Sequence, residues 1–423
     1  MTSTTRFSRL TAIWTFFGLV LLTVNLRAAI TGVSPLLGDL REGLNLSGVE
    51  VSVLTTLPVL CLGVFAALAP PLARRFGTET AITGALVLIT AGILLRIVPV
   101  RPALFAGTVL AGAGIAMGNV LTPAVIKRVF PRRLGALTGM AMMLMAGSGA
   151  LAAALAVPLN DTGGWRLALA VWAVPSLLAA LAWAPLTRMT ARTAERPPHR
   201  ARTSGGGSLL RVPLAWYVTL FMGLASLMFY VLMSWLPEIM RAQGYAPATA
   251  GMMVSVMMII GIPLGLVVPM AAARMRDQRP LVLAVAVTMV AGLGGLIVAP
   301  QAGWLWVTVL GLATGSAFPL AFTLLSLRSA TPSVAARMSG MAQTGGYVLA
   351  GVGPLAVGVL HTATGGWNVP LALLLALLVP EIVFGLLAAR PSFVHAEAAD
   401  PEPLTVSASP AVSVPADVPA PSR

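Results

Sequence analysis

The sequence has very little charge for its length, and acidic residues are the rarest part of it. Only 9% of the 423 residues are Asp, Glu, Lys or Arg, and 13 are acidic, whereas 57% are hydrophobic. A soluble protein could not bury so much apolar surface in one or two cores. Lipid must therefore be the solvent for most of the chain, and we predict an all-α integral membrane protein.

Cysteine, histidine and lysine are also scarce, and each scarcity excludes a class of function. The single Cys61 excludes an intramolecular disulfide framework, and because it lies in an apolar stretch we expect a buried, inert thiol. The three histidines, His199, His361 and His395, are too scattered for a metal centre or an enzyme site. The only lysine is Lys127 and no G-x-x-x-x-G-K sequence occurs, which excludes a nucleotide-driven pump. The sequence predicts no enzyme, no metal site and no cofactor.

Long apolar runs are abundant. Windows of the length that crosses a bilayer, about twenty residues, recur six times on each side of a polar gap. They cover residues 11–37, 47–70, 78–99, 102–126, 135–158 and 164–187, and then 212–237, 247–272, 280–299, 302–327, 335–360 and 368–389. The first window is longer than the apolar part of a cleaved signal and has no A-x-A exit, so we expect it to remain as a span.

These windows define the predicted domains. Residues 1–187 form a first six-helix bundle and residues 212–390 a second. Residues 188–211 are rich in Arg, Pro and Gly and are expected to form a flexible cytoplasmic linker. Residues 391–423 are expected to form a disordered cytoplasmic tail.

The positive charges sort onto alternate loops between the spans. One set of loops holds 21 of the 27 Lys and Arg residues. The opposite loops hold only Arg41, Arg101, Arg166 and Arg241, and two more, Arg27 and Arg96, fall inside spans. The positive-inside rule predicts that both termini are cytoplasmic in a bacterial-type inner membrane. The net charge of +14 is therefore a signal of topology, and no nucleic-acid partner is expected.

The two halves of the sequence repeat each other. TGGW occurs at 162–165 and again at 364–367, and TGMA at 138–141 matches SGMA at 339–342. The shifts are nearly constant, which indicates a duplication. Because each half has six spans, the two copies have the same orientation across the membrane. We predict 12 transmembrane helices in two parallel, pseudo-symmetric six-helix bundles around a midplane site.

Four stretches resemble the major facilitator superfamily, and more narrowly its cyanate and 2-nitroimidazole permease branch. They are NLRAAITGVSPLL, GNVLTPAVIKRVFP, FYVLMSWLPEI and SGMAQTGGYVLAGVGP. The resemblance implies a secondary transporter in which spans 1, 4, 7 and 10 line a central cavity and spans 2, 5, 8 and 11 flank it. Spans 3, 6, 9 and 12 would face the lipid.

The sequence departs from the superfamily at one loop. The loop between spans 2 and 3 usually has the form G-x-x-x-D-R-x-G-R/K. Here the stretch is PLARRFGTE, in which Arg74 stands in the place of the aspartate. The usual charge relay that locks one conformation is therefore not expected in its usual form.

Arg27 stands in the middle of span 1, where an arginine costs about 2.5–3.5 kcal/mol on insertion scales. It is too deep to reach either surface, and Thr23, Thr31 and Ser34 share its helical face. We therefore expect it to face a wet cavity. Two roles are open: a structural hydrogen bond to a neighbouring helix, or an anchor for an anion or nitro group that matches the planar guanidinium fork.

Other polar and aromatic groups lie on the predicted cavity helices. The repeat places Tyr230 opposite Arg27, and Gln343 and Tyr347 lie one turn apart on one face of span 11. The aromatic groups could pack, stack on a flat heterocycle or narrow a gate. The substrate-binding candidates are Arg27, Thr31, Asn119, Tyr230, Trp235, Gln343 and Tyr347.

Three acids are the candidates for coupling. Glu381 lies in the middle of span 12, where a structural pairing or a protonated buried acid is the competing interpretation. Glu50 and Glu238 lie near the outer mouth and could be ordinary interface charges. Arg96, near the outer end of span 3, is expected to extend its side chain to the membrane surface.

The leading hypothesis is an alternating-access carrier for a small anionic or nitro-bearing solute, such as cyanate or a nitroimidazole, with Arg27 as the anchor. The alternative is a proton-coupled exporter of drugs or metabolites. A non-transporting membrane sensor is a third class. The expected partners are a small-molecule substrate and the lipid bilayer, with protons open as a coupling ion, and the protein is expected to be a monomer.

Overall fold

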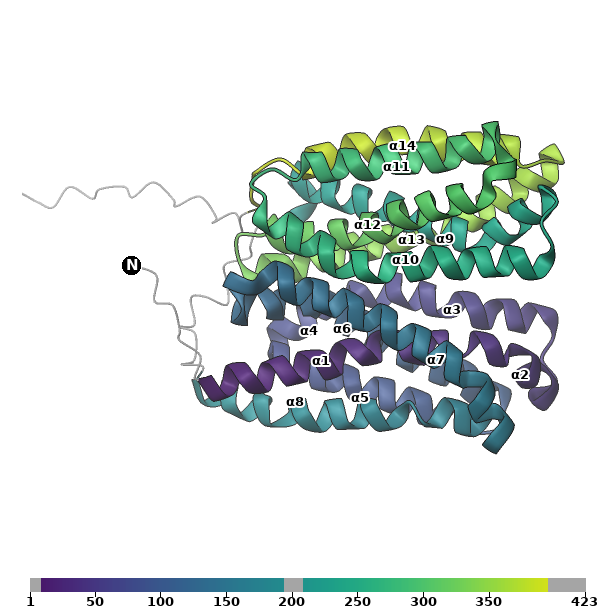
Figure 1. Ribbon diagram of the computed structural model, residues 1–423. Helices are drawn as coiled ribbons and strands as arrows, with labels where there is room; N and C mark the ends of the chain where they lie inside the picture. The colour runs from purple at the N-terminus through teal and green to yellow at the C-terminus, as the bar shows by residue number, and fades with distance from the viewer. Residues whose placement is uncertain (1–8, 194–207, 395–423) are drawn as a thin grey trace, which may run out of the picture.

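The structure, a computed structural model, describes residues 9–193 and 208–394. Its helices form two bundles that lie side by side (Figure 1). The N-terminal bundle contains α1 Arg9–Thr31, α2 Leu37–Leu44, α3 Gly48–Ala66, α4 Ala69–Phe76, α5 Thr78–Arg96, α6 Arg101–Val129, α7 Leu134–Ala170 and α8 Ala173–Thr193. The C-terminal bundle contains α9 Pro213–Ala242, α10 Pro247–Arg274, α11 Arg279–Val298, α12 Gly303–Leu327, α13 Pro332–Thr364 and α14 Asn368–Ala388.

The described helices match the predicted spans. Ten are long and apolar enough to cross a membrane, and the bent pair α3 and α4 adds an eleventh. The stretch Pro131–Thr187 is counted once although its 57 residues are long enough for two crossings. Gly163 and Gly164 have non-helical backbone angles inside it, so the chain turns there and twelve crossings result. The predicted all-helical membrane fold is confirmed.

Both ends of the described chain lie at one end of the bundles, on the left in Figure 1, together with both sides of the gap at 194–207. We call this the linker end and the opposite end the far end. The helix α8 continues to Thr193, past the predicted boundary at residue 187. The rest of the predicted linker, residues 194–207, and the predicted tail from residue 395 lie outside the described residues.

Small residues let helices of one bundle approach closely. A Cβ atom on Gly114 of α6 would collide with the Ala85 carbonyl of α5, and one on Gly315 of α12 would collide with Gly261 of α10. Close helix packing therefore requires glycine at both positions.

The two bundles meet through α3 and α4 against α13, and through α7 against α10. A Cβ atom on Gly139 of α7 would lie 2.6 Å from the Leu266 carbonyl oxygen of α10, and one on Gly340 of α13 would lie 2.9 Å from Pro70. Lys127 Nζ, at the end of α6, donates a 2.7 Å hydrogen bond to the Ser326 carbonyl of α12. The contacts of Gly139, Gly340 and Lys127 lie in the linker-end half of their helices, so these contacts join the bundles at that end.

Candidate functional site

The site is built around a break in span 1. The helix α1 ends at Thr31, and the chain then passes through a short 3₁₀ segment, Ser34–Leu36, into α2. Pro35 has no backbone N–H, so a regular helix cannot continue through this point without losing a hydrogen bond. Arg27 lies one turn before the break and is half-buried.

The polar stripe beside Arg27 is more occupied with its own backbone than predicted. Thr31 Oγ1 donates to the Gly149 carbonyl of α7 at 2.9 Å and to the Arg27 carbonyl at 3.2 Å. Thr23 has no exposed surface and donates to the Leu19 and Val20 carbonyls. The expectation of a cavity-facing stripe is therefore wrong at Thr23, because its side chain is buried and its hydroxyl bonds to carbonyls of its own helix.

Arg27, Tyr230 and Tyr347 come together from three helices, α1, α9 and α13. Tyr230 packs against the buried cluster that contains Tyr347, and Arg27 lies close enough for its charge to act on the Tyr347 side chain. Tyr347 is 6% exposed, whereas Tyr230 and Arg27 are half-buried. Tyr230 and Tyr347 lie in the middle of α9 and α13, and Arg27 lies one turn before the end of α1. The placement of Tyr230 opposite Arg27 stays a prediction of the repeat.

Two buried amides lie on helices of this region. Gln343 of α13 is fully buried and its Nε2 donates to Ser339 Oγ at 2.8 Å. Its Oε1, like Oδ1 of the buried Asn119 of α6, has no hydrogen-bond partner among the described residues. An unsatisfied buried polar group costs about 1–3 kcal/mol, so both amides have hydrogen-bonding capacity that a polar ligand can use.

Trp235 is not brought to this group. Its Nε1 donates to the Pro354 carbonyl of α13 at 2.8 Å, and its ring lies 5.6 Å from that of Trp367. These contacts belong to the packing of the C-terminal bundle. A substrate contact for Trp235 stays a prediction.

The three candidate coupling acids also lie elsewhere. Glu381 is 4% exposed and faces a small apolar cavity between α9, α11 and α14, with Phe221 and Met289 among its lining residues. Glu238 is exposed and forms a 2.8 Å ion pair with Arg241, one turn along α9. The structure describes no contact of either acid with Arg27.

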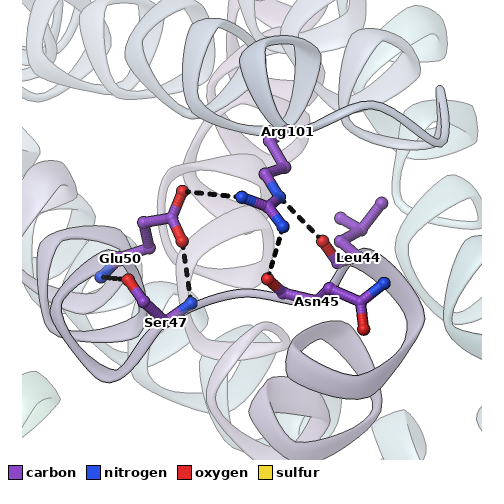
Figure 2. Close-up of polar contacts among 5 residues, drawn as sticks. All are labelled: Leu44, Asn45, Ser47, Glu50 and Arg101. Atoms are coloured by element: carbon purple, nitrogen blue, oxygen red, sulfur yellow. Dashed lines mark hydrogen bonds and ion pairs between the residues drawn. The ribbon is translucent and has the colours of Figure 1, made fainter.

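Glu50 belongs to a capping arrangement at the far end (Figure 2). Its carboxylate accepts from the Ser47 backbone N–H at 2.7 Å, and its own N–H donates to Ser47 Oγ, which together cap the start of α3. Arg101 lies 3.8 Å from Glu50 and donates to the Leu44 and Asn45 carbonyls at the end of α2. Hydrogen bonds from Ser47, then the charge of Arg101, hold the pKa of Glu50 below its ordinary value.

Arg96 does not extend to the surface, so that expectation is wrong. It is 2% exposed and lies against α6, where Gly107 makes room for its side chain: a Cβ on Gly107 would lie 2.9 Å from Arg96 Cγ. The glycine on the facing helix is the sequence signal that could have indicated this burial, but recognising it requires knowing which helices face each other.

The arrangement defines a class of protein: two six-helix bundles, joined at one end, with a half-buried arginine and two tyrosines between them. Comparison with known proteins gives the family. The sequence profile of the Major Facilitator Superfamily matches residues 19–354. The chain belongs to this superfamily of membrane transporters, and it is not an enzyme.

Individual relatives agree. The chain is 39% identical over 391 residues to the 2-nitroimidazole transporter of Escherichia coli, covering 92% of this chain and 99% of that protein. It is 30% identical over 352 residues to the cyanate transport protein of the same bacterium, covering 82% of this chain and 90% of that protein. The fold is similar to that of the proton:xylose symporter XylE, with a TM-score of 0.70 at 15% identity, covering 90% of this chain and 95% of that one.

Proposed function

We propose that the protein is a secondary carrier for a small anionic or nitro-bearing solute, of the size of cyanate or a nitroimidazole. The single observation that carries the proposal is that Arg27, Tyr230 and Tyr347 lie close to one another on helices of both bundles. The named activities of the two relatives favour the same class of solute.

Arg27 is the anchor in this proposal. A guanidinium offers a planar set of donors that matches two acceptor oxygens of a nitro or carboxylate group. The two tyrosines offer flat apolar surfaces and hydroxyl groups for the rest of a small planar molecule. The unpartnered amide oxygens of Asn119 in the N-terminal bundle and Gln343 in the C-terminal bundle are further hydrogen-bond acceptors.

Transport would proceed by alternating access of the two bundles. The contacts of Lys127, Gly139 and Gly340 join the two bundles at the linker end. In the proposed cycle these contacts separate when the site opens toward that end. With both termini cytoplasmic, as the positive loops predict, the far end would face outward. A transmembrane potential of 100 mV changes the free energy of moving one charge by about 2.3 kcal/mol. An anion importer therefore needs a coupled proton, a neutral substrate or a steep gradient.

Flux into proteoliposomes tests the proposal. Cyanate, a nitroimidazole and small carboxylates would be offered under imposed pH and voltage gradients to the wild type, Arg27→Lys and Arg27→Ala. We expect Arg27→Ala to lower flux at subsaturating substrate about tenfold or more, because a charge-assisted hydrogen bond is lost. Arg166→Ala, an exposed arginine at the far end, is the matched control. Full flux and unchanged affinity in Arg27→Ala would contradict the anchor role.

The second candidate is a proton-coupled exporter of lipophilic drugs or metabolites. It is favoured by Glu381, a buried acid in the C-terminal bundle. Arg27 disfavours cationic drugs because it would repel them from the central site. Transport of a quaternary ammonium compound by the purified protein would support the exporter and contradict an anionic substrate.

A further inference from the structure

A second cavity lies at the linker end, between the bundles and away from Arg27. Its volume is about 300 Å³, the lower end of the range of small-molecule sites. Arg74 of α4, Thr78 of α5 and Arg128 of α6 line it from the N-terminal bundle. Ser333 and Arg337 of α13 line it from the C-terminal bundle. The cavity therefore exists in this form only while the linker end is closed.

Three guanidinium groups border this cavity. No Asp or Glu is among its described lining residues, and Arg74 and Arg337 repel each other across the bundle interface. Glu79, behind the wall, forms an ion pair with Arg128. Glu79 thus compensates the charge of Arg128, and the like charges of Arg74 and Arg337 face each other between the two bundles at the closed linker end. Arg74 stands in the loop where the superfamily pattern has an aspartate.

The start of α13 adds to the positive potential. Pro332 and Ser333 are its first two residues and both line the cavity. The Thr331 hydroxyl caps the Val334 N–H at 3.3 Å, which leaves the first turn in helical geometry. The amino end of a helix of 33 residues carries a partial positive charge and favours an anion.

Shape and donors indicate the kind of anion. The cavity volume of about 300 Å³ is much larger than a single halide ion needs. Guanidinium groups bind the oxygens of phosphate in a fork geometry, and the Thr78 and Ser333 hydroxyls are further donors. We propose that this cavity binds a phosphate group, either inorganic phosphate or the headgroup of an acidic phospholipid, and that the bound group holds the linker end closed.

The consequence is regulation of the carrier by an anion that it does not transport. A ligand that binds only the closed linker end favours that conformation, by about tenfold when its concentration is ten times its Kd. The inference is independent of the proposed substrate, because it uses none of the residues around Arg27.

Thermal unfolding of the purified full chain, in a detergent without phosphate, tests the proposal. One arm adds inorganic phosphate and the other adds short-chain phosphatidylglycerol, with sodium chloride at equal ionic strength as the baseline. We expect at least one probe to raise Tm by about 2–4 °C in the wild type. The double variant Arg74→Gln, Arg337→Gln should lose this shift. Arg132→Gln, an exposed arginine at the same end outside the cavity, should keep it.

A second variant keeps the test decisive if the double variant is unstable. Arg74→Asp places a carboxylate beside Arg337, so it should raise Tm without phosphate and remove the response to phosphate. The arm that responds identifies the source, lipid or soluble. A shift that persists in the double variant and in Arg74→Asp, or no shift with either probe in the wild type, would overturn the proposal.

Discussion

Arg96 Nη1 donates a 2.6 Å hydrogen bond to the carbonyl oxygen of Ala29, across from α5 to α1. In an unbroken helix that carbonyl would accept from the Val33 N–H. Here Val33 N–H bonds the Ile30 carbonyl instead, because the helix ends at Thr31. The break in span 1 therefore leaves the Ala29 carbonyl, two residues after Arg27, without a backbone donor, and the buried Arg96 of span 3 supplies the hydrogen bond.

This bond gives the first prediction. Arg96→Met keeps much of the side-chain volume but leaves the Ala29 carbonyl buried without its donor, at a cost of about 1–3 kcal/mol. We expect a lower Tm and a weaker apparent substrate affinity, because the segment carrying Arg27 loses its support. Arg96→Lys should restore part of both, and Arg166→Met, exposed at the far end, should change neither. Unaltered Tm and affinity in Arg96→Met would show that the bond supports neither the fold nor the substrate site.

The second prediction concerns Lys127, whose amine bonds the Ser326 carbonyl of the other bundle. Lys127→Met removes a charged donor worth about 1.5–3 kcal/mol, so the linker end should open about tenfold more often. The readout is the alkylation rate of a cysteine placed at the buried Ala66, in a Cys61→Ser background. Arg132→Met provides the control. Equal alkylation rates in both variants would contradict a latch at this position.

The third prediction compares two glycines of α7. A Cβ on Gly139 would lie 2.6 Å from the Leu266 carbonyl, whereas one on Gly147 meets nothing within 4 Å. Gly147→Ala should be neutral or raise Tm, because alanine favours a helix by about 1 kcal/mol over glycine. Gly139→Ala should separate α7 from α10 and accelerate alkylation at the same engineered cysteine. If the two variants behave alike, the close contact does not hold the linker end closed.

The fourth prediction is a pH dependence at the far end. The pKa of Glu50 lies below its ordinary value of 4.5, mainly through hydrogen bonds from Ser47. Its carboxylate therefore adds stability above pH 4.5, and this stability is lost as the pH falls through the lowered pKa. Between about pH 6 and about pH 3.5, Tm should fall further in the wild type than in Glu50→Gln, whose side chain does not titrate. Parallel curves would mean that the capping bonds do not favour the charged form.

Much of the fold could be predicted from the sequence because its signals are local and dense. Each span contains enough apolar residues to be recognised alone, and the Gly163–Gly164 turn lies in a repeated TGGW motif. The placement of Tyr230 opposite Arg27 follows from the duplication that relates the two halves, and it stays a prediction. That prediction needed no side-chain geometry.

The remaining features depend on which helices face each other. The burial of Arg96 requires Gly107 on another helix, and a side chain at a helix end is otherwise expected to reach the surface. The linker-end cavity needs Arg74, Arg128 and Arg337 from three separate helices. In the sequence, only the unusual Arg74 indicated that this loop differs from its superfamily.

Lys127 is the only lysine of the chain, and it lies where the two bundles touch. Apart from the amino terminus, the protein therefore carries one primary amine. Reductive methylation with a carbon-13 reagent would place a single NMR-visible label at that contact, without any engineered residue. The natural protein already contains a spectroscopic reporter for the separation of its two halves.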